Sequence, residues 1–402
     1  MRIAVVSPFI DRRHGTERAL AELLERLART YGCEIHLFAQ RVADLSVERW
    51  NARRTGENGG VIFWHRVPCP SGAPILLSFA WWFWLNRIVR WSFSTFRRVR
   101  FAVVLSAGIN CSDANVVIVH ALFHRLQELA REKSGEGGGG QGGLRLLHRR
   151  MYYALLARLE RRIYGNPAVT LAAVSPRTAE QLRTYFSRSD VAVVANAVDA
   201  KFFSVGERLA RREEARRRRG LRTDELLLLL IGNDWEVKGV GTVLRAMAIM
   251  PDLPLRFLIV GNDTPESFQS LAKSLGVAER CLWETPAEDV RDFYAVADVY
   301  VCPSREDSFG LPVAEAMASG LAVITSTASG VGWLIEDGVD GFVMRDPLDA
   351  VTLSRLVRLL HDQPQLRERI AGAGASRAQS WSWERNAAEV WKLLQSVAAR
   401  RT

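Results

Sequence analysis

The chain has few cysteines, few prolines and no hydrophobic run of transmembrane length. Its 402 residues include 5 cysteines and 14 prolines. The cysteines lie far apart, form no Cys-x-x-Cys pair and are odd in number, so neither a disulfide framework nor a zinc site is indicated and free buried thiols are expected. The opening residues 1–7 read as a short first strand rather than a secretion signal. We therefore expect a cytoplasmic protein.

The composition is that of an ordinary globular protein. Hydrophobic residues make up 48% and charged residues 24% of the chain, which excludes a disordered, collagen-like or multi-spanning membrane protein. At roughly 100–200 residues per domain, the length predicts two or three compact units. The formal net charge of +10 favours anionic partners such as phosphates, nucleotides, anionic lipid or nucleic acid.

Apolar strand patterns alternate with amphipathic helix patterns, which is typical of βαβ units and parallel sheets. The expected strands are 3–7, 101–106, 116–120 and 171–174 in a first series, and 226–231, 256–260, 299–301 and 322–325 in a second. We expect an α/β protein with two doubly wound domains, 1–197 and 198–380, and a hinge near 196–200. The last helix, within 381–402, could cross back to the first domain.

Three segments lie outside this alternation. Residues 208–222 are rich in arginine and favour a solvated connecting helix over a lipid or nucleic-acid patch. Residues 135–143 are mostly glycine, and form either an inert insertion or a mobile flap. The apolar residues 75–84 are followed by tryptophans and arginines, a mixture that suits the membrane interface. A core helix with a basic outer face is an equal alternative.

The strongest functional signal is the segment 303–320. Asp307 and Glu315 have seven residues between them, and Phe309-Gly310-Leu311-Pro312 forms a turn that opens a helix, with Pro312 suited to its first position. Backbone N–H groups at such a helix start can bind anions or hydroxyl-rich ligands. The two carboxylates can accept hydrogen bonds from several sugar hydroxyls. A structural helix start would explain the proline but would not require both acids.

A phosphate site is predicted in 231–239. Lys238 lies between the first strand of the second domain and the following helix, where its charge and the helix dipole act on the same anion. Parallel sheets bind ligands at the carboxyl ends of their strands.

The corresponding loop of the first domain is 7–17, where Gly15 permits close approach of a ligand and Thr16 can cap the helix. His120 ends the strand at 116–119. It is either a structural histidine or part of a site at that sheet edge.

These motifs carry a resemblance. Lys238, the Asp307–Glu315 spacing, and the segments 15–17, 174–175 and 196–199 resemble the retaining glycosyltransferases of family 4. That family has the GT-B fold, two Rossmann-like domains facing across a cleft. The resemblance covers about 200–375 almost continuously and the first domain only at scattered points. Within the family, 231–241, 260–265 and 270–277 are most similar to glucosyltransferases of the lipopolysaccharide core.

The resemblance implies a role for each matching residue. Lys238 would bind the donor diphosphate, and Glu315 would bind the ribose hydroxyls. The sugar would be held by Asp307 and by the backbone of Phe309, Gly310 and Leu311. Gly15 would approach the phosphates, and His120 would contact the sugar or the acceptor. Asn233 belongs to the donor-binding set but stands where the family commonly has arginine, so Arg12 or Arg13 could help Lys238. Asp307 replaces the common glutamate, and Glu306 could share its role.

The function implied is transfer of a hexose from a nucleoside-diphosphate sugar, a UDP-sugar being favoured, to a lipid-linked or cell-envelope glycan acceptor. No metal or other cofactor is expected. Contact with the anionic inner face of the cytoplasmic membrane is a further expectation. The alternative is a nucleotide-sugar-binding protein without catalysis. A nucleic-acid partner is not expected, because no helix-turn-helix, RNP or zinc pattern accompanies the charge.

Overall fold

The computed structural model describes residues 1–12, 14–50, 60–70, 72, 74–135, 143–287 and 289–401, with the backbone alone at 130, 132–135 and 143–150. They form two compact units, the first unit (Met1–Ala195 with Trp383–Thr402) and the second unit (Asn196–Ser382). Of the predicted glycine-rich loop, 136–142 lie outside the described residues, as does Arg13. The cysteines are free; Cys69 is half-buried and the other four are buried.

The first unit is built on a seven-stranded parallel sheet in the order β5-β3-β1-β6-β7-β8-β9. Its strands, with the small β2–β4 pair, are β1 (Arg2–Val6), β2 (Phe9–Ile10), β3 (Glu34–Ala39), β4 (Arg41–Val42), β5 (Val61–Arg66), β6 (Val103–Ala107), β7 (Val116–Val119), β8 (Thr170–Ala173) and β9 (Ala192–Val193). The strand order reverses between β1 and β6. Ligands bind at such a switch point in doubly wound sheets.

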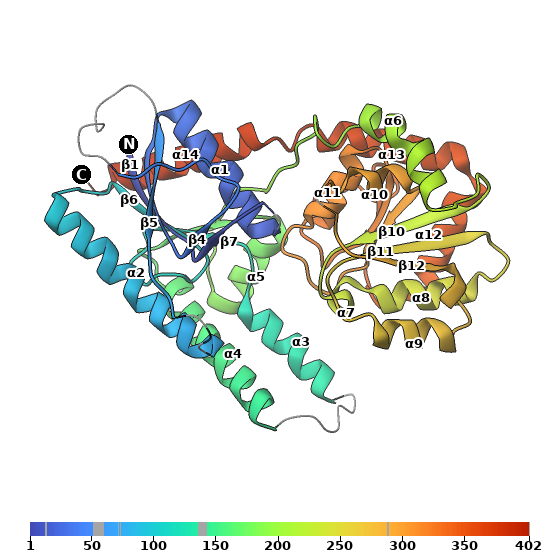
Figure 1. The fold of residues 1–402 in the computed structure, drawn as a ribbon, viewed down its shortest axis with the longest axis horizontal. Coiled ribbons are helices and arrows are strands. Elements are labelled where there is room, and N and C mark those ends of the chain that lie inside the picture. Colours follow the sequence, from blue (N-terminus) through green and yellow to red (C-terminus); the bar gives the residue numbers. More distant parts are fainter. Residues whose placement is uncertain are drawn as a thin grey trace. The chain divides into compact units, whose positions relative to one another are not determined.

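Helices cover the sheet of the first unit (Figure 1). They are α1 (Gly15–Tyr31), α2 (Ile75–Arg97), α3 (Phe123–Gly135), α4 (Gly143–Tyr164), α5 (Pro176–Phe186) and α14 (Trp383–Ala399). The last of these comes from the far end of the chain and lies along α1, where the rings of Tyr31 and Trp391 stack with centroids 5.1 Å apart. The Asn386 amide also donates to the Ala195 carbonyl oxygen over 2.8 Å.

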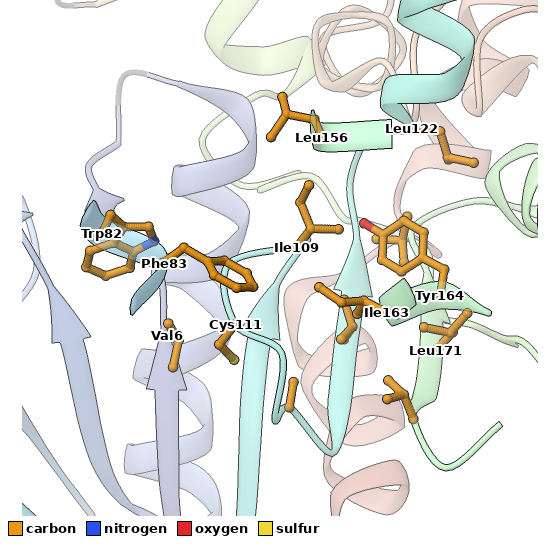
Figure 2. Packing of buried hydrophobic residues seen from close by; sticks show 14 of the residues in the cluster. Val6, Trp82, Phe83, Ile109, Cys111, Leu122, Leu156, Ile163, Tyr164 and Leu171 are labelled. Carbon is orange, nitrogen blue, oxygen red and sulfur yellow. The ribbon is translucent and has the colours of Figure 1, made fainter. Parts of the chain in front are cut away.

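The core of the first unit joins the sheet to the helices α2 and α4. Figure 2 shows Trp82 and Phe83 of α2 beside Val6 of β1, with Ile163 and Tyr164 of α4 packed near Leu171 of β8. These side chains are apolar, and each is less than one-tenth exposed. Their burial ties α2 and α4 to the ends of the central strands.

The second unit has a six-stranded parallel sheet in the order β12-β11-β10-β13-β14-β15, which is the Rossmann order. Its strands are β10 (Leu226–Ile231), β11 (Leu255–Val260), β12 (Cys281–Glu284), β13 (Val299–Val301), β14 (Ala322–Ser326) and β15 (Phe342–Met344). Its helices are α6 (Val205–Arg218), α7 (Trp235–Lys238), α8 (Val240–Ile249), α9 (Glu266–Ser274), α10 (Arg291–Val296), α11 (Leu311–Ala318), α12 (Ala350–Asp362) and α13 (Pro364–Ala378), with short 3₁₀ turns at Ala278–Arg280 and Val331–Trp333. The order reverses between β10 and β13.

The arginine-rich segment 208–222 is not the solvated helix that we expected. The Arg216 side chain of α6 is buried and donates to the Val296 and Glu225 carbonyl oxygens over 3.1 and 2.9 Å. Arg212 and Arg216 both pair with Asp298, the residue before β13. The arginines therefore hold α6 against the edge of its own domain, because each guanidinium can bridge several acceptors at once.

Helix α2 packs on the core of the first unit, as the core-helix alternative predicted, while its outer side is apolar as well as basic. It buries Trp82, Phe83 and Asn86 against the core of the first unit. Its opposite side is exposed and carries Trp81, Trp84 and other large apolar residues. No helix within the described parts of the chain is both long enough and apolar enough to cross a bilayer.

Candidate functional site

The loop after β10 positions Lys238 at the switch point of the second unit. Asp234, in the left-handed region, caps the single turn α7 that ends at Lys238. The next residue, Gly239, has φ +84°, and a Cβ there would lie 2.3 Å from the Pro303 carbonyl oxygen. Only glycine therefore lets this loop pack against the segment that follows β13. This packing brings Lys238 beside residues 303–307.

Lys238 and Asp307 form an ion pair, with Nζ 2.5 Å from Oδ2. Burial opposes the charged form of the lysine, but the carboxylate of Asp307 and other nearby groups outweigh this and raise the pKa of Lys238. The ammonium is thus charged at neutral pH and held in place by Asp307. Asp307 is thus the acid that pairs with Lys238.

Three consecutive backbone amides open the helix α11. Among the described residues, the N–H groups of Phe309, Gly310 and Leu311 have no hydrogen-bond acceptor. Phe309 and Leu311 are only 3% and 6% exposed, and buried polar groups of the backbone are nearly always paired. Unpaired donors at the positive end of a helix are suited to binding an anion or a sugar oxygen. The helix begins at Leu311, so Pro312 is its second residue, not its first as we expected.

Glu315 is one turn further along α11 and is 4% exposed. The Tyr294 hydroxyl donates to its Oε2 over 2.6 Å. Tyr294 belongs to α10, and the sequence analysis did not identify it, because no motif links that helix to Glu315. The tyrosine orients a buried carboxylate, whose oxygens need hydrogen-bond donors in place of water.

Asn233 and Arg305 flank the Lys238 loop. Asn233 is exposed at the end of β10, and its Oδ1 accepts a hydrogen bond from the Asn262 amide over 2.9 Å. The Arg305 amide donates to the Val237 carbonyl oxygen over 2.7 Å, and its guanidinium lies 3.6 Å from Glu236. Arg305 is therefore a second cation beside the Lys238 turn that the sequence analysis missed.

The loop between β1 and α1 borders a cavity of about 480 Å³ in the first unit. Thr16, Glu17 and His120 line it, together with residues of α2 and α4. Burial lowers the pKa of His120 to about 4, so the ring is neutral at neutral pH. His120 follows β7, whose carboxyl end lies at the same sheet edge as that of β1 and β6. Gly15 is the first residue of α1.

Two expectations about this loop are wrong. Thr16 does not cap α1: the N-cap is His14, whose side chain makes no capping hydrogen bond but contacts Asp11 over 2.9 Å. Arg12 is not free to neutralise a leaving group, because its guanidinium pairs with Glu22 and Glu25 of α1. The two acids lie about two and three turns into the helix, and the loop motif gives no sign of these pairs.

The residues of the second unit form one compact polar constellation. A charged lysine, free helix N–H groups and two oriented carboxylates are the groups that a nucleoside diphosphate joined to a sugar would need. Lys238 and Asp307 are in contact, and a Cβ on Gly310 would lie 3.6 Å from the Asp307 Oδ2. Of the residues predicted from the sequence, Lys238, Asp307 and Gly310 are thus brought together.

Two family models match the chain. Residues 13–202 match Glycosyltransferase Family 4, and residues 211–377 match Glycosyl transferases group 1. The chain belongs to the glycosyltransferases of family 4 and group 1. Its first relative by sequence is a D-inositol 3-phosphate glycosyltransferase of Thermomonospora curvata, 34% identical over 257 residues. That match covers 58% of this chain and 59% of the relative, so the chain spans little more than half of its length.

Solved structures share the fold of this glycosyltransferase chain. WaaG, a glycosyltransferase involved in lipopolysaccharide biosynthesis, superposes with a TM-score of 0.73 at 19% identity over 96% of this chain and 99% of its own. HepE of Anabaena in complex with UDP-glucose gives 0.66 at 16% identity over 98% and 100%. At these identities the likeness establishes two Rossmann-like domains of the GT-B type, as predicted.

Proposed function

We propose that this chain transfers a hexose from a UDP-sugar to a lipid-linked or cell-envelope glycan acceptor with retention of anomeric configuration. The observation that carries the proposal is the run of unpaired amides at Phe309–Leu311 next to the Lys238–Asp307 pair. Breaking the bond between sugar and diphosphate leaves negative charge on the phosphate, and preorganised cations and N–H groups stabilise it. HepE, a protein of the same fold, binds UDP-glucose.

In the proposed mechanism each residue acts on a different part of the donor. Lys238 binds the diphosphate and stabilises it as it leaves, and Arg305 adds positive charge beside the same turn. Glu315, oriented by Tyr294, accepts hydrogen bonds from the ribose hydroxyls. Asp307 and the amides of Phe309–Leu311 hold the sugar. The acceptor hydroxyl oxygen attacks the anomeric carbon as the electron pair of the broken bond goes to the diphosphate. The proton of that hydroxyl goes to the departing diphosphate. No metal is required in this scheme.

Donor binding and hydrolysis test this proposal. We expect UDP-glucose to stabilise the wild-type chain against heat and to be hydrolysed slowly. Lys238→Ala and Glu315→Gln should lose both effects, whereas Lys273→Ala, an exposed lysine of α9, should retain them. Stabilisation without turnover in the presence of any glycan acceptor would favour the non-catalytic alternative. Equal stabilisation of wild type and Lys238→Ala would show that the donor site is misplaced.

We further propose that α2 contacts an anionic membrane surface. Leu77, Trp81, Trp84, Ile88 and Trp91 recur every three or four residues, and each is more than half exposed. Helical spacing puts them on one face. Arg87 and Arg100 border the adjoining groove of about 680 Å³, which Trp84 and Trp91 also line. Aromatic rings beside arginines suit the headgroup layer of a membrane.

Vesicle sedimentation tests this contact. The chain should sediment with phosphatidylglycerol vesicles but not with phosphatidylcholine vesicles at low salt. The double variant Trp84→Ser/Trp91→Ser should lose most of this binding. The control Val339→Ser/Val351→Ser changes two residues of the second unit that are 42% and 49% exposed, and it should bind normally. Equal sedimentation of all three proteins would remove α2 from the contact.

A further inference from the structure

Three residues with buried polar side-chain atoms line the cavity of the first unit. Within the described parts of the chain, the Trp82 Nε1, the Tyr164 Oη and the His120 Nε2 have no hydrogen-bond partner, although little or none of each atom is exposed. Trp82 and Tyr164 are 1% and 0% exposed. All three residues line the same cavity. A buried donor without a partner costs about 1–3 kcal/mol, so three around one space indicate a ligand that pairs with them.

These atoms come from three separate elements. Trp82 belongs to α2, Tyr164 ends α4, and His120 follows β7. Figure 2 shows Trp82 and Tyr164 on opposite sides of Ile109, which also lines the cavity. A Cβ on Gly108 would lie 3.9 Å from the Tyr164 hydroxyl, so the backbone at Gly108, which also lines the cavity, lies close to this hydroxyl. A ligand between the two walls could therefore reach donors on both sides.

The charge of the lining excludes a phosphate. Among the described residues that line the cavity there is no lysine or arginine. Burial raises the pKa of Glu17, and His120 is neutral because burial lowers its pKa to about 4. A phosphate placed here would lose its hydration and gain no cation. The part of a ligand that enters this cavity is therefore uncharged.

Much of the remaining lining is apolar, although Ser7, Gln40 and Asn110 also border the cavity. Ile75, Phe79, Ile109, Phe123 and Tyr152 supply much of its surface. The volume of about 480 Å³ is within the range of small-molecule sites, which combine apolar walls with a few polar groups. Such walls suit an alkyl chain or the C–H face of a sugar ring, and the unpaired polar atoms would form hydrogen bonds with the hydroxyls of that ring.

We propose that this cavity binds the acceptor, and that the acceptor portion within it is an uncharged hydroxyl-bearing ring with an apolar substituent, as in an alkyl glycoside. The inference rests on the proposed glycosyltransferase function and names its acceptor class. This acceptor class differs from D-inositol 3-phosphate, the phosphorylated polyol in the name of the Thermomonospora curvata relative. Trp82, Tyr164 and His120 would bind the hydroxyls, and the apolar wall would bind the substituent.

Calorimetric titration of the full chain with hexyl β-D-glucopyranoside, glucose and D-inositol 3-phosphate tests this proposal. Hexyl glucoside should bind saturably and more tightly than glucose, and inositol phosphate should show no binding in the cavity. Tyr164→Phe and Trp82→Phe, which remove one donor each, should weaken hexyl glucoside about fivefold. Ser78→Phe, which fills the cavity from α2, should abolish binding. Trp84→Phe, on the exposed side of the same helix, should leave it unchanged.

The proposal is overturned if hexyl glucoside does not bind, if it binds Ser78→Phe as well as wild type, or if inositol phosphate binds more tightly and is weakened by Ser78→Phe. Affinity for UDP-glucose, measured on every variant, keeps the two proposals separate because that site lies in the second unit. Unchanged UDP-glucose affinity shows that the second unit is intact, and a wild-type pattern of hydrogen exchange in β1 and β6 shows that the first unit of a variant is folded. If the wild-type chain did not bind UDP-glucose, this would instead contradict the proposed function.

Discussion

Gly239 determines where the Lys238 side chain can lie. Its positive φ costs any other residue about 1 kcal/mol or more, and a Cβ would also overlap the Pro303 carbonyl oxygen at 2.3 Å. Gly276 has φ +68° with nothing within 4 Å of a Cβ. Gly239→Ala should therefore weaken UDP-glucose binding at least about tenfold, because the loop must move away from β13, while Gly276→Ala should only lower stability.

Calorimetry with UDP-glucose and thermal unfolding of both variants measure this difference. The two alanines share the strain of a left-handed backbone, so their comparison isolates the contact with Pro303. If Gly276→Ala weakened donor binding as much as Gly239→Ala, the effect would be one of general stability and Lys238 would not depend on this packing.

His120 should make stability depend on pH below neutrality. Its pKa is about 4 in the folded chain and about 6.5 when unfolded, so between these values the unfolded state binds more protons. Stability therefore falls as the pH decreases from 6.5 toward 4. Denaturant unfolding across this range should show a smaller fall for His120→Gln than for wild type. Parallel curves for the two proteins would mean that His120 is solvated rather than buried.

The residues of the donor site were predictable where a single stretch of chain contains them. Asp307, Gly310 and Leu311 lie within one loop and helix start, and the structure places Lys238 on Asp307. Tyr294 and Trp82 were missed because each reaches its site from a helix elsewhere in the sequence. An ordinary tyrosine or tryptophan in an amphipathic helix carries no signal of the polar atom that it presents to a site.

At the scale of elements, α6 is held by some of its arginines and not by others. Arg216 is buried and makes hydrogen bonds to Val296, Glu225 and Asp298. Arg217, its neighbour, has a side chain that is 70% exposed and pairs with Glu214 on the same helix. Arg216→Ala should lower the free energy of unfolding of the second unit by about 3 kcal/mol, because it leaves Asp298 partly unpaired. Arg217→Ala should change it by less than about 0.5 kcal/mol.

The free energy of unfolding of the two variants is measured with denaturant, and hydrogen exchange of β10 and β13 reports on the second unit. A similar loss for both would mean that the total positive charge of α6, and not the buried contacts of Arg216, stabilises the domain. No loss for either would mean that α6 is the solvated connecting helix that the sequence favoured.

Strands were predictable where the chain is continuously apolar. The expected strands 226–231 and 299–301 coincide with β10 and β13, which are buried on both faces. β3 and β5 were missed because they contain His36 and His65, polar residues in an otherwise apolar run. The two rings stack and their nitrogens lie 2.9 Å apart. Pairing of β3 with β5 brings the buried His36 against the half-buried His65, and Phe93 of α2 contacts both rings.

At the scale of the whole molecule, each unit carries its own sheet and its own candidate site at the point where the strand order reverses. The donor residues follow β10 and β13, and the cavity lies at the ends of β1 and β6. The same topological rule therefore accounts for both locations. The sequence predicted the two series of strands, but the pairing order that creates the switch points comes from the structure.

The last helix, α14, should stabilise the first unit, although the chain just before it belongs to the second unit. Immediately before α14 the chain belongs to the second unit, yet α14 packs on α1 through Trp391 and hydrogen-bonds the Ala195 carbonyl oxygen through Asn386. A chain ending at Ser382 should therefore show faster hydrogen exchange in α1 and β6, while it still binds UDP-glucose through the second unit. Trp391→Ala should reproduce part of this effect, whereas Lys392→Ala, which leaves the stacked ring in place, should not. Faster exchange confined to α12 and α13 would instead place the contribution of α14 in the second unit.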